Sequence, residues 1–136
     1  MNLNVEKILI IGLGMIGSSI ALASKSKGIK VYGFDKSNNS IKEALEKNII
    51  DSKVESILDI NSKDFVKKVD LIIVSVPPKQ TLDVLNDLKD IWNTDVTITD
   101  TSSVKNHIKL NGASNIILSH PIAGSDQSGI SAANGD

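Results

Sequence analysis

The chain has 136 residues, 40% of them hydrophobic, and a net charge of −1 from 15 basic and 16 acidic side chains. This length suits one domain with its own core, and the charge is spread without the polybasic block typical of nucleic-acid or membrane-surface binding. No apolar stretch approaches the roughly 18 residues of a membrane span. Cysteine is absent, which excludes disulfides and thiol catalysis. We therefore expect a cytoplasmic protein without a metal that binds neither nucleic acid nor membrane.

Short runs rich in Ile and Val alternate with amphipathic segments along the chain, as in a parallel sheet covered by helices. The runs are apolar on both faces, which indicates strands buried from both sides. They predict a Rossmann-type, doubly wound, mainly parallel α/β sheet with helices on both faces and the strand order 3-2-1-4. The expected strands are Lys7–Ile11, Lys30–Phe34, Leu71–Val76, Val96–Thr99 and Asn115–Leu118, with a weaker one at Val54–Ile57.

Three segments have helical periodicity, and a shorter helix is expected near Ser103. Gly28 and Asn48 follow two of these helices, where a positive φ is often needed. Glu43 and Lys47 are spaced to pair on an outer helix face. The predicted helices and inward residues are Met15–Lys27 with Ile16, Ile20 and Ala23, Ser40–Lys47 with Ile41, Ala44 and Leu45, and Lys79–Ile91 with Leu82, Leu85 and Leu88.

A glycine motif, Gly12-Leu-Gly14-Met-Ile-Gly17, directly follows the first strand and opens a helix. The first glycine permits a tight turn, the second lets a pyrophosphate approach the backbone, and the third lets helix and strand pack closely. The helix N-terminus at Met15 and Ile16 supplies unpaired N–H groups and the positive end of a dipole. Glycine-rich turns are common, but the strand, the helix and a downstream acid together predict a dinucleotide site.

Asp35 is that acid, at the end of the second strand and 21 residues beyond Gly14. A carboxylate here can accept both hydroxyls of an adenine ribose and repels the 2′-phosphate of NADP, so NAD is the expected cofactor. Lys36 could soften this discrimination. The alternative is a solvated turn aspartate.

Two polar segments leave the next strands. Val74-Ser-Val76-Pro77-Pro78 leaves the strand expected beside the first one, and its prolines stiffen a loop that could form a wall of the cofactor crevice. A plain strand-exit turn is the alternative. Thr99-Asp-Thr-Ser-Ser103-Val-Lys105 would present hydroxyls to the same crevice, or one of its serines could simply cap a helix.

His120 follows the last predicted strand, within Ser119-His-Pro-Ile-Ala-Gly-Ser125-Asp126-Gln-Ser128-Gly129. Imidazole is well suited to exchange a proton near neutral pH, and small polar residues cluster after it. A structural histidine is the alternative. His107 lies in a short polar helix and is expected to be solvated. Because the carboxyl ends of parallel strands meet at one edge of a sheet, these motifs should converge there.

Together these motifs resemble the prephenate dehydrogenase family. The resemblance is carried by Ile10–Gly17, Phe34-Asp35, Val74–Pro78, Thr99–Lys105 and, most specifically, Ser119–Ser125 with Ser128-Gly129. It covers essentially the whole chain in order. Residues 1–136 are accordingly interpreted as an N-terminal dinucleotide-binding domain.

The resemblance implies that prephenate and NAD give 4-hydroxyphenylpyruvate, carbon dioxide and NADH, in tyrosine biosynthesis. It implies that His120 takes up the proton of the ring hydroxyl. It also implies that Ser103 orients this histidine and contacts the nicotinamide. It places Ser125 near the substrate, with Asp126 where the family usually has glutamate.

The family also has a second, all-helical domain, which forms most of a homodimer interface and supplies an arginine for the substrate carboxylate. This chain has neither that domain nor any arginine, so we expect it to bind NAD but to turn over little prephenate alone. Alternatives are another NAD-dependent hydroxyacid dehydrogenase or reductase, and a non-catalytic NAD sensor. Prephenate and arogenate are not distinguished.

Overall fold

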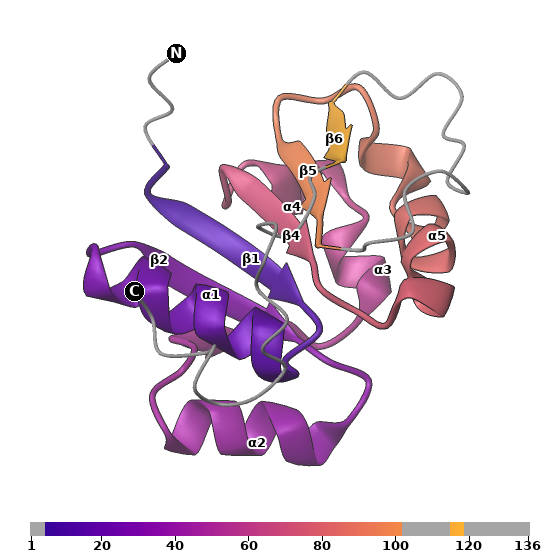
Figure 1. Cartoon of the computed structure of the whole chain (residues 1–136). Helices are drawn as coiled ribbons and strands as arrows, with labels where there is room; N and C mark the ends of the chain where they lie inside the picture. Colours follow the sequence, from indigo (N-terminus) through magenta and orange to yellow (C-terminus); the bar gives the residue numbers. More distant parts are fainter. Residues whose placement is uncertain (1–4, 102–114, 119–136) are drawn as a thin grey trace.

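The computed structural model describes residues 5–101 and 115–118. In this part of the chain, six parallel strands form one sheet in the order β3-β2-β1-β4-β5-β6, with β1 and β4 at its centre (Figure 1). The order of the first four strands is the one that the sequence predicted. The strands are β1 Lys7–Ile11, β2 Lys30–Phe34, β3 Ser52–Lys53, β4 Leu71–Val74, β5 Thr97–Asp100 and β6 Ile116–Leu118.

Side chains of β1 alternate between two separate hydrophobic clusters, because successive residues of a strand face opposite sides of the sheet. Ile8 and Ile10 belong to the cluster beneath α1 and α2, which also contains Ala21 and Ile41. Leu9 and Ile11 belong to the other cluster, together with residues of α3, α4, α5 and η1. This two-sided burial explains why the strand is apolar throughout.

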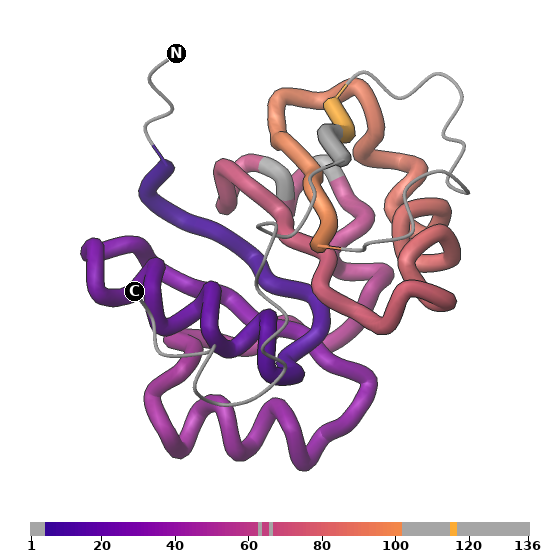
Figure 2. Tube along the Cα trace, in the orientation of Figure 1, coloured from indigo at the N-terminus to yellow at the C-terminus, as the bar shows by residue number. Residues whose placement is uncertain are grey.

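Helices cover both faces of the sheet, which confirms the doubly wound α/β prediction. The helices of residues 15–46 lie on one side of the sheet, and those of residues 57–91 lie on the other (Figure 2). The helices are α1 Met15–Ser26, α2 Asn38–Glu46, α3 Ile57–Ile60, α4 Lys63–Val66, α5 Pro78–Asp87 and the 3₁₀ turn η1 Lys89–Ile91.

The predicted inward face of α1 was wrong at Ile16, which is 54% exposed. Gly17 and Ala21 are the buried residues of this helix instead. A Cβ on Gly17 would meet the Gly12 carbonyl and lie 3.3 Å from Ile10 Cγ2, so the helix approaches the sheet through its smallest side chains. Backbone proximity, rather than side-chain hydrophobicity, sets the rotation of α1.

The predicted helix Lys79–Ile91 is divided at Leu88 into α5 and η1. The carbonyl of Leu85 accepts the Leu88 N–H at 3.2 Å and the indole N–H of Trp92 at 3.0 Å. These bonds take the place of the next α-helical bond, and the chain tightens into a 3₁₀ turn. The buried positions of Leu85 and Leu88 agree with the prediction.

Other boundaries also differ. The weak strand predicted at Val54–Ile57 is wrong, because β3 is Ser52–Lys53, Val54 is buried after it and Ile57 begins α3. Neither α3 nor α4 was predicted, and Leu45 is partly exposed rather than inward. The predicted strand Leu71–Val76 ends at Val74. The helix expected near Ser103 lies outside the described residues.

Local turn predictions are confirmed. Gly28 has φ +82° and Asn48 has φ +60°, each just beyond a helix end. Lys47 and Glu43 pair at 2.5 Å on the exposed face of α2. The hydrogen bond from Lys47, followed by its charge, holds the pKa of Glu43 below its ordinary value.

Candidate nucleotide-binding site

The loop after β1 packs tightly against the loop after β4. Gly12 has φ +101° and donates its N–H to the Phe34 carbonyl at 2.8 Å, while Ser75 donates its N–H to Ile11 at 2.7 Å. A Cβ on Gly12 would collide with the carbonyl group of Ser75. Only glycine satisfies both the positive φ and this close approach. The tight turn that the motif predicted is therefore present.

Gly14 is the N-cap of α1, and a Cβ built on it would meet no atom within 4 Å. No side chain caps this end of the helix, and its first turn contains no acidic residue. The side chains of Met15 and Ile16 are exposed. An anion can therefore approach the backbone N–H groups and the positive end of the helix dipole directly.

Gly17 is buried and lies against the Gly12 carbonyl, as expected for the third glycine of the motif. One residue further, Ser18 donates its N–H to Gly14 at 2.9 Å and its hydroxyl to Leu13 at 3.2 Å. These bonds hold the glycine loop against the first turn of α1.

Asp35 follows β2 and is half-buried. Its Oδ2 accepts the N–H of Leu13 at 2.7 Å, and its Oδ1 accepts the N–H of Ser37 at 2.8 Å. Each carboxylate oxygen retains a lone pair for a further donor. Asp35 is thus anchored beside the glycine loop, unlike a merely solvated turn aspartate, with capacity left to accept hydroxyl groups.

A cleft of about 400 Å³ joins these features. Its lining combines Gly12 and Gly14 with Asp35–Ser37, Ser75–Pro77 and one face of α5. The structure therefore brings together Gly12, Gly14, Asp35, Val76 and Pro77 from the predicted cofactor site. Met15, Ile16 and Gly17 belong to the adjoining first turn of α1 but do not line the cleft.

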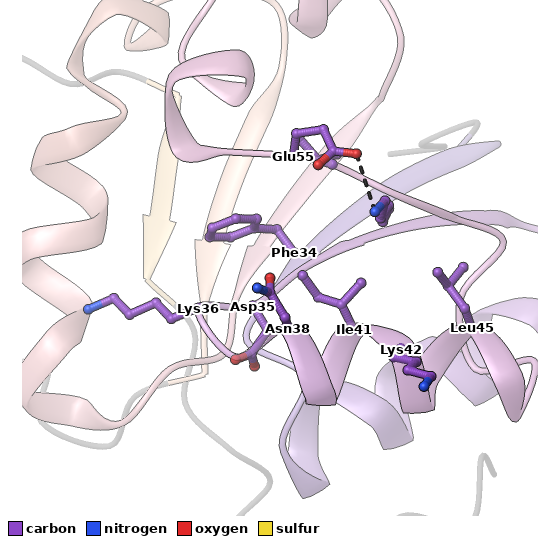
Figure 3. A pocket seen from close by; sticks show the side chains of 10 residues that line it. Phe34, Asp35, Lys36, Asn38, Ile41, Lys42, Leu45 and Glu55 are labelled. Carbon is purple, nitrogen blue, oxygen red and sulfur yellow. Dashed lines mark ion pairs between the residues drawn. The ribbon is translucent and has the colours of Figure 1, made fainter.

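A second cavity, of about 440 Å³, lies on the α2 side of β2. Figure 3 shows Ile41, Lys42 and Leu45 along α2, the ring of Phe34, and Lys36 extending away from α2. Lys53 and Glu55 pair across 3.4 Å at its edge. No glycine of the motif lines this cavity, whereas the first cleft is lined by Gly12 and by Gly14 at the uncapped start of α1.

Polar groups also gather where β4 and β5 end. Thr101 donates its hydroxyl to that of Ser75 at 3.3 Å and its N–H to the Val74 carbonyl at 3.0 Å. Asp100, the last residue of β5, is fully buried. These contacts join the two strand exits, as expected if their loops share one crevice.

The remaining predicted site residues, Ser103, His120, Ser125 and Asp126, lie outside the described residues, as does His107. Sequence reasoning missed the polar stripe of α5, whose Gln80, Asp83 and Asp87 line the cleft. Their spacing of three and four residues, just after the proline wall, could have indicated this. In residues 5–101 and 115–118 no helix has the length and apolarity to cross a membrane, and no group of three or more metal-ligating side chains occurs.

Comparison with known proteins gives consistent matches. The family model of the prephenate dehydrogenase nucleotide-binding domain matches residues 20–136. The prephenate dehydrogenase of Bacillus subtilis (strain 168) is 34% identical over 143 residues, which cover 98% of this chain and 37% of that protein. The prephenate dehydrogenase of Lactococcus lactis subsp. cremoris (strain MG1363) is 39% identical over 142 residues, which cover 94% of this chain and 37% of that protein.

Among solved structures, prephenate dehydrogenase from Aquifex aeolicus, in complex with hydroxyphenyl propionate and NAD⁺, superimposes with a TM-score of 0.73. It is 30% identical in sequence, and the match covers 96% of this chain and 46% of that one. The chain therefore spans less than half the length of these relatives.

Proposed function

This chain belongs to the family of prephenate dehydrogenase nucleotide-binding domains, and from that premise we propose that it binds NAD for the oxidation of prephenate. The observation that carries the proposal is the cleft in which an open helix N-terminus, Gly14 and the anchored carboxylate of Asp35 meet. The Aquifex aeolicus relative that superimposes on this chain is a complex with NAD⁺. Both support NAD as the cofactor.

The described residues fit the parts of this cofactor. The backbone at Gly12, Gly14, Met15 and Ile16 would hold the diphosphate, because Gly14 leaves open space above the start of α1. Asp35 would accept the hydroxyls of the adenine ribose with its remaining lone pairs. Val76 and Pro77 would form the facing wall, with Gly17 keeping α1 close to the sheet.

NAD would supply the hydride acceptor. The reaction proposed is oxidative decarboxylation of prephenate to 4-hydroxyphenylpyruvate, as in tyrosine biosynthesis. We assign to His120 the acceptance of the proton from the ring hydroxyl, and to Ser103 the positioning of this imidazole and a contact with the nicotinamide. His120 is two residues beyond Leu118, which ends β6 at the carboxyl edge of the sheet.

Ser125 and Asp126 are proposed to contact the substrate. A further helical domain is proposed to complete the substrate site and to form a homodimer in the full-length gene product, since the relatives are more than twice as long as this chain. Lysine is a poor substitute for the bidentate carboxylate contact of arginine, which this chain lacks. The 136 residues alone should therefore bind NAD but oxidise little prephenate.

The test of the chemistry uses the full-length gene product with prephenate or arogenate as substrate. His120→Asn should retain NAD affinity but lose about 100-fold or more in turnover, because general acid–base catalysis contributes on this order. His107→Asn is the matched control and should retain the parent rate. Unchanged turnover in His120→Asn would contradict the assigned role, and absence of NAD binding to the parent protein would contradict the proposal itself.

A further inference from the structure

The far end of the nucleotide cleft is formed by α5. This helix begins at Pro78, directly after the cleft wall, and presents Gln80, Asp83, Val84 and Asp87 to the cavity. Residues spaced by three, four and seven lie on one helix face, so the four side chains form a continuous edge. The cleft therefore also runs along about two turns of α5.

The order of the site residues orients the nucleotide, given the proposed function. The diphosphate belongs at Gly14 and α1, and the adenine ribose belongs at Asp35. The base then lies beyond Asp35, where Ile57 and Val84 line the cleft. Val84 is 5% exposed, and Ile57 packs against the same hydrophobic cluster. These side chains offer apolar contact to the faces of the adenine ring. The polar edge of the ring would then point toward α5.

Two acidic side chains of α5 line this end of the cleft. Asp83 and Asp87 are exposed, and neither side chain has an ion pair or hydrogen bond within the part of the chain that the structure describes. An ionised carboxylate only accepts hydrogen bonds. It can accept a hydrogen bond from the 6-amino group of adenine, whereas at the same position a 6-oxopurine presents a carbonyl oxygen, which a carboxylate repels. Gln80 could donate or accept, so it does not distinguish the two bases.

The position along α5 separates the two acids. With a rise of about 1.5 Å per residue, Asp83 lies about 9 Å beyond Pro77 along the helix and Asp87 about 15 Å beyond it. Asp83 is therefore the nearer of the two to the Pro77 wall of the cleft. We propose that the carboxylate of Asp83 accepts a hydrogen bond from the 6-amino group of adenine and thereby makes the cleft selective for adenine over 6-oxopurine dinucleotides.

The test compares binding of NAD and nicotinamide hypoxanthine dinucleotide by isothermal titration calorimetry, using this chain and two variants. The parent should prefer NAD by roughly fivefold or more, because a hydrogen bond to a charged acceptor is replaced by a repulsive contact. Asp83→Ala should reduce the preference to less than about twofold by weakening NAD binding. Asp87→Ala, which removes another exposed acid one turn further on, should keep the parent preference.

The outcomes separate this inference from the function on which it rests. If the parent binds NAD without preferring it, or if Asp83→Ala retains the parent preference, the role of Asp83 is overturned and the NAD site stands. A loss of preference in Asp87→Ala alone would also overturn it. If the parent binds neither dinucleotide, the proposed function fails, and this inference fails with it.

Discussion

The carboxylate of Asp35 accepts the backbone N–H of Leu13 at 2.7 Å, although the two residues are 22 positions apart. This bond joins the end of β2 to the middle of the glycine loop. A residue that would contact the cofactor ribose thus also holds the loop that would contact the diphosphate. Changes at Asp35 should therefore be designed to separate loss of charge from loss of the loop contact.

Asp35→Asn removes the negative charge and can keep the Leu13 contact through its amide oxygen, although the bond from Ser37 is lost because the amide nitrogen only donates. We expect NAD affinity to fall about tenfold and the NADP-to-NAD affinity ratio to rise about tenfold or more, since each tenfold corresponds to about 1.4 kcal/mol. The exposed Lys36 beside it favours the extra phosphate. Calorimetric titration of both cofactors measures the ratio. Asp95→Asn, at an exposed position outside the cleft, controls for net charge, and an unchanged ratio in Asp35→Asn would contradict the ribose assignment.

Gly12→Ala should destabilise the fold as well as the site. The new Cβ would collide with the carbonyl group of Ser75, between the ends of the central strands β1 and β4. Alanine would also have to adopt a φ of +101°, which side chains rarely allow. We expect the free energy of unfolding to fall by about 3 kcal/mol, as strain and overpacking add. Gly28→Ala is the matched control, because it has φ +82° but open space around it and should cost only about 1 kcal/mol. If urea denaturation gave equal losses of unfolding free energy for the two variants, the carbonyl group of Ser75 would have to move aside at no cost.

Gly14→Ala should weaken NAD binding more than it destabilises the fold. Its φ is −77° and no atom lies within 4 Å of the added Cβ, so the free energy of unfolding should fall by no more than about 1 kcal/mol, the cost of alanine in place of glycine at an N-cap. A bound diphosphate would meet that methyl group, and NAD affinity should fall about tenfold or more. Parent-like affinity, measured on the same folded sample, would place the diphosphate elsewhere.

The sheet could be predicted from sequence because its signals are local. Residues of β1 are apolar on both faces, and the glycine motif follows it directly. The two-residue β3 could not be found in this way. Ser52 and Lys53 are polar, and they form a strand because they pair with Tyr32 and Gly33 of β2. Hydrophobicity instead drew the prediction to Val54, which is buried as the chain leaves that pairing.

The same distinction between local signals and contacts between strands applies to the site residues. The turn at Gly12 and the acid at Asp35 were predicted, since each sits at a fixed distance from a strand. The bond between Leu13 and Asp35, and the contact of Gly12 with Ser75, depend on how three strands lie side by side. The exposed position of Ile16 was missed for the related reason that the helix rotates to bring Gly17 against the sheet.

Asp51 offers a test of stability that should leave the cleft untouched. Its Oδ2 accepts the N–H of Val31 at 2.8 Å, and its Oδ1 pairs with Lys25 at 3.3 Å, which also donates to the Asn48 carbonyl at 2.7 Å. Asp51→Ala leaves the Val31 N–H without this acceptor and should lower the free energy of unfolding by about 1–2 kcal/mol. Lys25→Met removes only a partly exposed ion pair and one donor, and should cost less than about 1 kcal/mol.

Both variants should bind NAD with parent affinity, because none of these residues lines the cleft. Chemical denaturation monitored by circular dichroism measures the stability, and calorimetry measures the affinity. A larger loss in Lys25→Met than in Asp51→Ala would show that the lysine, rather than the strand N–H, dominates this junction. Weakened NAD binding in a stably folded Asp51→Ala would instead show that the start of β2 is coupled to Asp35 at its other end.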